Sequence, residues 1–378
     1  MKKICYITSV PGTINSFFVS QIKYLSENGY EIYVICSPDD SLQKILGSNI
    51  RFIPIEIPRG VNFIKMLKAT YNLIKIFKKE RFDLIQYSTP NASLCSAIAG
   101  RISRIKIRNY HLMGFRYLGT RGAGGLILKY LEKITCKLST SIECVSKSNL
   151  KLGIEEGIFS EEKASVIWNG STGGVDLKRF DYSKRDKWRR EIRMKLGYSN
   201  VDFIYGFVGR ITRDKGINEI LEVFLEFKDE SKLLLIGNFE NENTLDKNLI
   251  NKAMKDKNIK FHKSVIDIEK YFAAIDVLLL PSYREGFGNV IIEAAAMGTP
   301  AIVSNIPGPI DAIEKEKTAL TVIKKDKDSL LNAMRKIKCE EYKDMGEKAY
   351  IFVKENFESN ELNKKILERK KKILGEEQ

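Results

Sequence analysis

The sequence lacks any apolar run long enough to cross a membrane. Its longest apolar stretches, such as 273–280, end or are interrupted by charge well short of the ~20 residues that a transmembrane helix needs. The first apolar run, 4–10, reaches Pro11 and Gly12 at once and has neither a long apolar core nor a small-residue cleavage site. We therefore expect no membrane-spanning helix, and we interpret 4–10 as a first strand and not as a signal peptide.

Paired cysteines are lacking as well. The chain has six cysteines, none of them in a C-x-x-C spacing, and several lie in apolar runs where a reduced thiol acts as a small hydrophobe. We expect neither structural disulfides nor a zinc site. A DxD string occurs at 326–328, but it lies in a lysine-rich stretch away from the predicted strand ends, and we interpret it as solvated surface.

Acidic residues are in deficit. Lys and Arg number 63 against 48 Asp and Glu, which gives a net charge of +15 and favours an anionic partner. Nucleic acid, acidic lipid and a diphosphate ligand all satisfy this charge. No zinc-finger or aromatic RNA-binding signature accompanies it, so we expect no nucleic-acid partner. A basic nucleic-acid-binding protein remains the alternative from a different functional class.

Two domains are expected, because 378 residues exceed the roughly 250–300 at which a single hydrophobic core stops growing. Short β-rich runs alternate with helical stretches in two series, a pattern typical of doubly wound parallel sheets. The predicted strands are 3–8, 30–37, 82–88, 105–111 and 141–146, then 203–208, 232–236, 275–281 and 301–304. The predicted helices include 15–27, capped by Asn15 or Ser16, then 217–227 and 290–297.

The two series are separated by a polar, charged stretch. Residues 181–200 contain no strand-like run, and we place the domain boundary there, although 180–197 also fits the first helix of the second domain. We predict Rossmann-like domains at 1–180 and 181–354. A helix at about 355–378 is expected to pack back on the first domain.

A charged loop follows the predicted strand at 203–208. Gly209 and Arg210 begin it, and Lys215 and Gly216 end it before the next helix. In parallel sheets ligands bind at the carboxyl ends of strands, where loops and helix N-termini present N–H groups. Two cations and two glycines at such a place suit a diphosphate. Ordinary solvated charges of a surface turn are the alternative.

A second loop carries two carboxylates eight residues apart. Glu285 lies in the loop and Glu293 in the second turn of the following helix, with Gly286 and Gly288 between them and Asn289 as the expected helix cap. The glycines allow close approach of a ligand, and the helix start offers an anion site. We interpret the carboxylates as groups that bind different hydroxyls, not as an acid/base pair. Helix-start charges favoured by the helix dipole are the alternative.

Together these motifs resemble glycosyltransferase family 4, the retaining glycosyltransferases with the GT-B fold. The E-x7-E arrangement from Glu285 to Glu293 and the 209–216 loop carry the resemblance, which His111 and the 169–176 turn extend over nearly the whole chain. It implies two Rossmann-like domains facing each other across a cleft. It also implies transfer of a sugar from a nucleotide donor without a metal or other cofactor.

The resemblance implies a role for each cation and for the helix start. Arg210 and Lys215 would bind the distal phosphate of the donor and stabilise the leaving diphosphate. Asn289 and Val290 would add backbone N–H contacts to the same phosphates.

The carboxylates are assigned in the same way. Glu293 would hold the ribose hydroxyls, while Glu285, with the backbone of Phe287 and Gly288, would hold the transferred sugar.

Three further positions complete the expected site. His111 would lie near the anomeric centre or an outer hydroxyl of the sugar, although a lone histidine is more often structural. Gly12 would let the first loop approach the phosphate or the acceptor. Gly237, with 263–265, would flank the nucleobase.

The positive charge concentrates in the predicted acceptor domain. Lys65, Lys68, Lys75 and Lys79 recur at helical spacing and should share one face, opposite an apolar face that comprises Leu67, Leu73, Ile74 and Phe77. Further basic residues follow at Arg101, Arg104, Lys106, Arg108, Arg116 and Arg121. A basic face near an anionic leaflet contributes about 1 kcal/mol per residue at best. It predicts peripheral attachment of a cytoplasmic protein to the plasma membrane, with a solvated helix face as the alternative.

The function predicted from these features is retaining, metal-independent hexosyl transfer. The donor would be a UDP-linked nucleotide sugar that carries a hexose or N-acetylhexosamine. The acceptor would be a saccharide, free or linked to polyprenyl diphosphate, in the synthesis of bacterial capsule or O-antigen. A nucleotide-sugar epimerase of the same fold is the alternative among enzymes.

Overall fold

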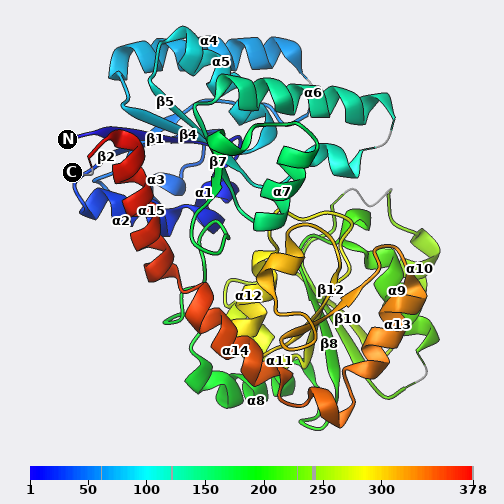
Figure 1. Cartoon of the computed structure of the whole chain (residues 1–378). Coiled ribbons are helices and arrows are strands. Elements are labelled where there is room, and N and C mark those ends of the chain that lie inside the picture. The colour runs from blue at the N-terminus through cyan, green and yellow to red at the C-terminus, as the bar shows by residue number, and fades with distance from the viewer. Residues whose placement is uncertain (61, 121, 228, 241–243, 377–378) are drawn as a thin grey trace. The chain divides into compact units, whose positions relative to one another are not determined.

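The computed structural model describes residues 1–376 apart from 61, 121, 228 and 241–243. The chain forms two compact units, each built on its own parallel sheet (Figure 1). Unit 1 comprises Met1–Gly173 and Ser359–Gln378, and unit 2 comprises Gly174–Glu358. The chain therefore passes from unit 1 to unit 2 after Gly173, whereas the sequence placed this boundary at 180. Residues 174–180 belong to unit 2, where the Val175 N–H donates to the Phe357 carbonyl.

Unit 1 is a seven-stranded Rossmann-like sheet of order β3-β2-β1-β4-β5-β6-β7 with every pair parallel. Its strands are β1 (Lys3–Ile7), β2 (Glu31–Cys36), β3 (Arg51–Pro54), β4 (Leu84–Tyr87), β5 (Ile107–Leu112), β6 (Ser141–Cys144) and β7 (Ala164–Val166). Its helices are α1 (Pro11–Phe17), α2 (Val19–Glu27), α3 (Leu42–Leu46), α4 (Phe63–Glu80), α5 (Pro90–Ile102), α6 (Ala123–Leu138), α7 (Lys147–Glu155) and α15 (Ser359–Leu374).

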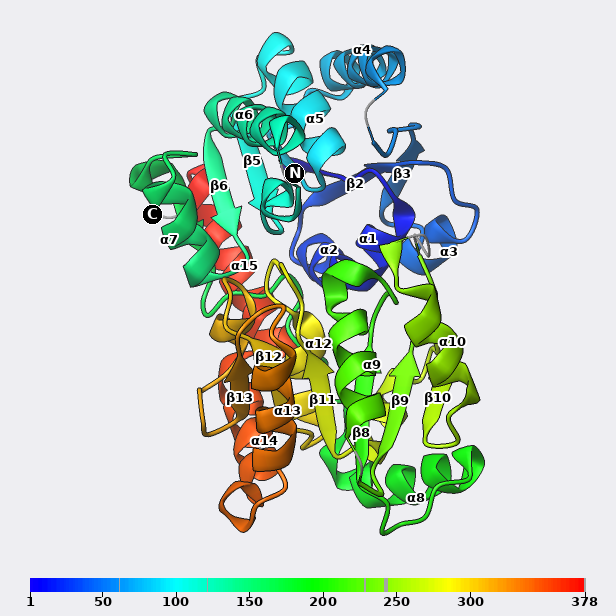
Figure 2. The same ribbon diagram turned by 90° about the vertical axis from the view of Figure 1, so that its right-hand side faces the viewer.

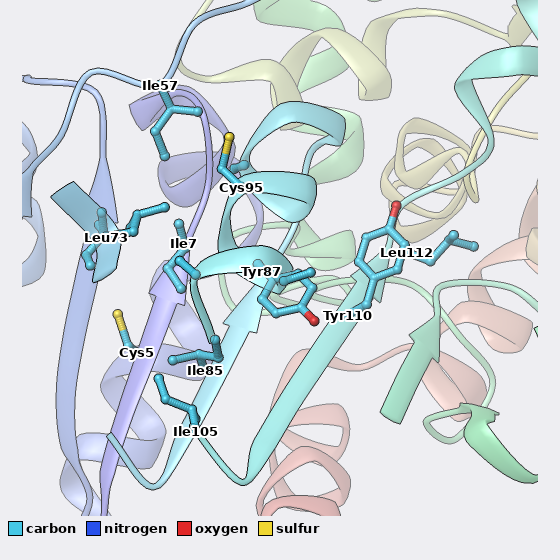
Figure 3. Close-up of a cluster of buried hydrophobic side chains, with 14 of the residues drawn as sticks. Cys5, Ile7, Ile57, Leu73, Ile85, Tyr87, Cys95, Ile105, Tyr110 and Leu112 are labelled. Atoms are coloured by element: carbon cyan, nitrogen blue, oxygen red, sulfur yellow. The ribbon is translucent and has the colours of Figure 1, made fainter. Parts of the chain in front are cut away.

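Two apolar clusters cover the two faces of this sheet, because side chains alternate along each strand. Cys5 and Ile7 of β1 belong to the cluster under α4 and α5, part of which Figure 3 shows, whereas Ile4 and Tyr6 face α1, α2 and α15. Helix α15 contributes Leu362, Ile366 and Leu367 to the second cluster. The C-terminal helix thus forms part of the core of unit 1.

Unit 2 is a six-stranded parallel sheet of order β10-β9-β8-β11-β12-β13 (Figure 2). Its strands are β8 (Ile204–Val208), β9 (Lys232–Ile236), β10 (Ile259–His262), β11 (Val277–Leu280), β12 (Ala301–Ser304) and β13 (Ala319–Val322). Its helices are α8 (Arg185–Leu196), α9 (Ile217–Glu226), α10 (Lys247–Lys255), α11 (Ile268–Ala274), α12 (Asn289–Ala296), α13 (Lys327–Lys336) and α14 (Met345–Asn356). Strand β11 is buried throughout, as its continuous apolar run predicts.

Several local expectations are corrected. The first helix begins at Pro11 and not near Asn15 or Ser16, because Pro with its fixed φ is favourable in the first helical turn. The charged stretch after 180 is helix α8, which ends at Gly197 in the left-handed conformation. Asp326 of the DxD string is the N-cap of α13 and accepts a hydrogen bond from the Ser329 N–H.

All six cysteines are free, and five of them are buried. Within the described part of the chain, no helix has the length and apolar character needed to span a bilayer.

Candidate functional site

The candidate site of unit 2 lies where the strand order reverses. Strand β8 pairs with β9 on one side and with β11 on the other, so the chain winds outward in both directions from this pair. At such a switch point the loops at the carboxyl ends of the strands diverge and leave a crevice where ligands bind in α/β folds. The loops 209–216 and 281–288 are the two that follow β8 and β11.

Backbone contacts hold these two loops together. The Tyr283 N–H donates to the Asp214 carbonyl at 2.8 Å. Gly216 has φ +75°, and a Cβ there would lie 2.4 Å from the Pro281 carbonyl oxygen, so only glycine permits this approach. Arg284 adds an ion pair to the Asp214 carboxylate at 3.0 Å.

The joined loops bring Lys215 and Glu285 into direct contact. Lys215 Nζ lies 2.5 Å from Glu285 Oε1, and their side chains are only 16% and 12% exposed. The Ser282 hydroxyl donates to the same carboxylate oxygen at 2.8 Å. Two of the residues predicted from sequence thus meet, 70 positions apart, in a largely desolvated cluster where each charge contact is stronger than in water.

Arg210 lies at the rim of this region. Its side chain is 49% exposed, and its guanidinium pairs with Glu240 at 3.2 Å. The nearby Gly237 has φ +152°, and a Cβ there would meet the Gly209 carbonyl oxygen at 1.8 Å. The loop after β9 is therefore held against the loop that carries Arg210.

The start of helix α12 supplies the backbone donors. Gly288 is its N-cap, with φ +92°, and the helix begins at Asn289, so Asn289 is the first helical residue and the cap predicted there is wrong. Glycine replaces a capping side chain because the left-handed φ suits it. Phe287 is 3% exposed and packs edge-on against Phe357, which anchors the loop, while Val290 lies in the first helical turn.

Glu293 lies in the second turn of α12 and is half-buried. The pKa of its carboxyl is raised to about 7, mainly by burial; the Arg179 guanidinium opposes the rise, and the neighbouring Glu269 carboxylate adds to it. Such a carboxyl changes charge near neutral pH.

His111 lies in unit 1, at the carboxyl end of β5, and is 5% exposed. Its Nε2 is 3.3 Å from the Thr172 hydroxyl, its Nδ1 faces Glu143 Oε2 at 3.9 Å, and its ring packs edge-on against Phe18. Burial lowers the pKa of the imidazole, and Glu143 opposes this.

Gly12 is the second residue of α1 and is exposed. A Cβ at this position would meet no atom within 4 Å, so crowding within the chain does not require glycine there.

Sequence reasoning missed several residues of both regions. Asp214, Ser282 and Arg284 lie beside the predicted cations and glycines, and their place in the same loops was the available signal. Glu143 and Lys370, which lie behind His111, are 227 positions apart, and no spacing in the sequence connects them.

Two family profiles match the chain in succession. Residues 14–172 match "Glycosyltransferase Family 4", and residues 189–352 match "Glycosyl transferases group 1". Together the two matches include most of both units.

Individual relatives cover almost the same span. A capsular polysaccharide biosynthesis glycosyltransferase, CapM of Staphylococcus aureus, is 29% identical over 89% of this chain and 87% of its own. The UDP-Gal:alpha-D-GlcNAc-diphosphoundecaprenol alpha-1,3-galactosyltransferase of Escherichia coli is 27% identical over 89% of this chain and 87% of its own.

Among solved structures, the Anabaena protein HepE in complex with UDP-glucose superposes with a TM-score of 0.79 over 98% of this chain and 99% of its own, at 18% identity. This likeness concerns the fold, and the family profiles concern the sequence. Two Rossmann-like units and both profiles agree, and the chain belongs to glycosyltransferase family 4, whose members have the GT-B fold.

Proposed function

We propose that the protein transfers a hexose or N-acetylhexosamine from a UDP-linked donor to a saccharide or polyprenyl-diphosphate-linked acceptor, in the synthesis of bacterial surface polysaccharide. The observation that carries this proposal is the Lys215–Glu285 pair beside the start of α12, at the switch point of unit 2. The relatives support the choice of substrates, because one is a capsule enzyme and another is named for UDP-galactose and a diphosphoundecaprenol acceptor.

Departure of the nucleoside diphosphate is the step that this cluster would assist. The bond between the anomeric carbon and the diphosphate oxygen breaks, and negative charge develops on the leaving phosphate. Lys215 and Arg210 would bind that charge together with the N–H groups at the start of α12, in place of a divalent cation. We therefore propose transfer without a metal.

The carboxylates would orient the donor. Glu285, beside the backbone of Phe287 and Gly288, would accept hydrogen bonds from the transferred sugar, and Glu293 would accept them from the ribose hydroxyls. Neither is proposed as a nucleophile, so retention would follow from departure and attack on the same face of the sugar within one ion pair. The acceptor proton would then pass to the departing diphosphate.

A donor panel tests this proposal. Purified protein is screened by thermal shift against UDP- and GDP-sugars, because a bound donor stabilises the fold by mass action. Release of nucleoside diphosphate is then followed with and without a lipid-linked acceptor, in the presence and absence of EDTA. Release that requires the acceptor and survives EDTA supports metal-independent transfer, whereas loss of activity restored by Mg²⁺ or Mn²⁺ contradicts it. Conversion of the donor sugar without an acceptor would favour the epimerase.

A membrane surface is proposed as the second partner. The sequence assigned Leu67 to the apolar face of α4, but Leu67 is 71% exposed. The packed face consists of Ala69, Leu73 and Phe77. In a helix with 3.6 residues per turn, Leu67 points about 160° away from Ala69. Arg121, which the sequence placed among the basic residues, lies outside the described residues.

Large apolar side chains instead share the exposed surface of α4 and α6 with lysines. This apolar stripe comprises Phe63, Ile64, Leu67 and Tyr71 of α4 and Leu126, Ile127 and Tyr130 of α6, all at least 57% exposed. Helix α5 lies between α4 and α6 on one face of the sheet, as Figure 2 shows. Lys65, Lys68 and Lys75 are exposed on α4, and no acidic residue precedes Glu80 in that helix. Apolar side chains beside basic ones suit the interface of an anionic bilayer.

A further inference from the structure

A buried charge network lies behind His111 and joins four elements of unit 1. Lys370 of α15 is fully buried, and its ammonium group is 3.0 Å from both carboxylate oxygens of Glu143 on β6, which is 2% exposed. The same ammonium donates to Gln86 Oε1 of β4 at 2.6 Å. Asn109 of β5 donates to that Gln86 oxygen at 3.0 Å.

Burial of such a pair costs free energy that apolar side chains would not cost. Removing two charges from water carries a desolvation penalty that the mutual attraction often does no more than offset. Apolar residues of similar volume would attach α15 to the sheet equally well, and Leu362 and Ile366 already do so. The charges at Glu143 and Lys370 therefore call for a role besides attachment.

The neighbouring imidazole indicates that role. Glu143 Oε2 faces His111 Nδ1 at 3.9 Å, while the other ring nitrogen lies 3.3 Å from the Thr172 hydroxyl. A carboxylate on the Nδ1 side favours the tautomer that carries its proton on Nδ1 and leaves Nε2 unprotonated.

A lone carboxylate would also favour protonation of the ring. Opposite charges within about 4–6 Å favour the charged form of both groups. Lys370 offsets this effect, because its ammonium group neutralises Glu143 and repels a second positive charge at His111. Burial acts in the same direction on the imidazole.

We propose that Glu143 and Lys370 are positioning residues for His111: the carboxylate orients the imidazole, and the buried ammonium group of α15 cancels its charge so that the ring stays neutral during sugar transfer. This inference rests on the proposed sugar transfer and on the place near the anomeric centre that the family resemblance implies for His111. Positive charge develops on the sugar as the leaving group departs, and an imidazolium ion beside it would oppose that charge.

The charged and titratable groups around the ring are few. Glu143 faces it from β6, and Lys370 and Arg369 act from α15, the latter with Nε 3.9 Å from Glu143 Oε1. Tyr6 of β1 and Cys144 of β6 are further titratable groups near Glu143, and burial together with that carboxylate raises the pKa of each above its usual range. Burial by itself would raise the pKa of Glu143, yet Lys370 and His111 hold it well below its usual range.

Nitrogen-15 NMR of histidine-labelled full-length protein tests the proposal directly, because the chain has only two histidines and His262 serves as an internal reference. In the unaltered protein the His111 ring is expected to have a pKa below the usual range of a histidine and, when neutral, to be mainly in the Nδ1-protonated tautomer. In Lys370→Met its pKa should rise by roughly 1–3 pH units, since Glu143 is left uncompensated. Lys370→Arg should restore the original value.

Lys371→Met is the matched control, because it removes the same charge from an exposed position on the same helix. Its His111 titration should equal that of the unaltered protein. An unchanged His111 pKa in Lys370→Met would overturn the proposal. Should Lys370→Met fail to fold, Glu143→Gln decides: a changed tautomer ratio supports the proposal, and an unchanged ratio overturns it.

Measurement of kcat as a function of pH distinguishes a failure of this inference from a failure of the proposed function. Under saturating donor, the loss of kcat on acidification should begin at higher pH in Lys370→Met than in Lys371→Met, with the KM for the donor unchanged. If the His111 pKa rises in Lys370→Met but the protein transfers no sugar, the proposed function is refuted and the positioning role of Glu143 and Lys370 stands. If the protein transfers sugar but the His111 titration in Lys370→Met is unaltered, the positioning role is refuted and the proposed function stands.

Discussion

At the scale of single residues, Lys215 and Arg210 differ in environment although the sequence presents them as a pair. Lys215 is largely buried against Glu285, whereas Arg210 is half-exposed and pairs with Glu240. An exposed ion pair is worth little, while a desolvated charge contact is strengthened by the low dielectric around it. The two cations should therefore contribute unequally to catalysis.

Lys215→Ala is expected to lower kcat by roughly 10²–10³-fold, as removal of a preorganised donor to developing charge does. Arg210→Ala should have the smaller effect. Lys232→Ala, which removes a lysine that contacts Asn258 at the amino end of β9, is the control and should retain full activity. Steady-state kinetics with the preferred donor measure all three, and near-normal turnover in Lys215→Ala would refute its assigned role.

Glu293 gives the stability of the protein a defined pH dependence. Its folded-state pKa of about 7 lies above the ordinary value of 4.5. The stability it contributes is therefore complete below about pH 4.5 and is lost as the pH rises through 7. Glu293→Gln cannot ionise, so it should unfold at a higher temperature than the unaltered protein at pH 8.5 and at a similar temperature at pH 4.5.

Thermal unfolding at both pH values measures this difference. Glu355→Gln on the exposed side of α14 is the matched control and should leave the pH profile unchanged. If Glu293→Gln gave the same shift at both pH values, burial of the carboxyl would not be the cause.

Gly237 and Gly12 have opposite tolerances although both were predicted as site residues. A Cβ at Gly237 would overlap the Gly209 carbonyl, whereas one at Gly12 has open space. Gly237→Ala should lower the melting temperature and donor binding together. Gly12→Ala should keep the melting temperature, and any loss of activity in it would then report on a ligand. Calorimetry of both variants measures their melting temperatures. Equal melting temperatures would contradict the predicted clash between a Cβ at position 237 and the Gly209 carbonyl.

At the scale of elements, the apolar stripe of α4 and α6 should govern membrane binding more than the lysines do. A combined Ile64→Ser and Leu67→Ser variant is expected to lose co-sedimentation with anionic liposomes. Val201→Ser, at a position of unit 2 that is 91% exposed, should bind as the unaltered protein does. Undiminished co-sedimentation of the double variant would refute this prediction, and binding that is insensitive to anionic lipid content would refute an anionic surface as the partner.

The strands that the sequence did not predict are β3, β7, β10 and β13, and these are the four edge strands of the two sheets. An edge strand pairs on one side only and is covered less completely, so it need not form a continuous apolar run. Residues of β3 and β7 are exposed or half-buried and those of β10 mostly half-buried, whereas β4 is buried throughout; β13 is the exception, because three of its four residues are buried. Central strands were predictable because burial on both faces leaves a clear mark on their composition.

The residues of the two candidate site regions also divide into those that the sequence could predict and those that it could not. Lys215 and Glu285 were predictable as neighbours because each follows a central strand, and adjacent parallel strands end at one edge. Glu143 and Lys370 were not, because their meeting depends on the path of α15 across the sheet, and neither residue stands out from its surroundings in the sequence.

At the scale of the whole molecule, unit 1 is discontinuous. Its sheet is built by residues before Gly174, but part of its core and the partner of Glu143 come from Ser359 onward. Termination after Glu358 should therefore lower hydrogen-exchange protection in β1, β4 and β6 while β8, β9 and β11 of unit 2 stay protected. Termination after Leu374 is the control. Undiminished protection of β6 in the shorter chain would show that α15 is dispensable.

The fully buried Lys370 also affects synthesis of the chain. The ribosome delivers Glu143 and its sheet first, then all of unit 2, and only afterwards the lysine that neutralises that carboxylate. At roughly 5–20 residues per second, the newly made sheet waits roughly 10–40 s for its counter-ion. During that interval the part of the unit 1 sheet that α15 will cover stays exposed, and Glu143 has no lysine partner. We expect chaperones to bind this exposed apolar surface. A nonsense codon that removes only α15 would leave the cell with that unfinished state permanently.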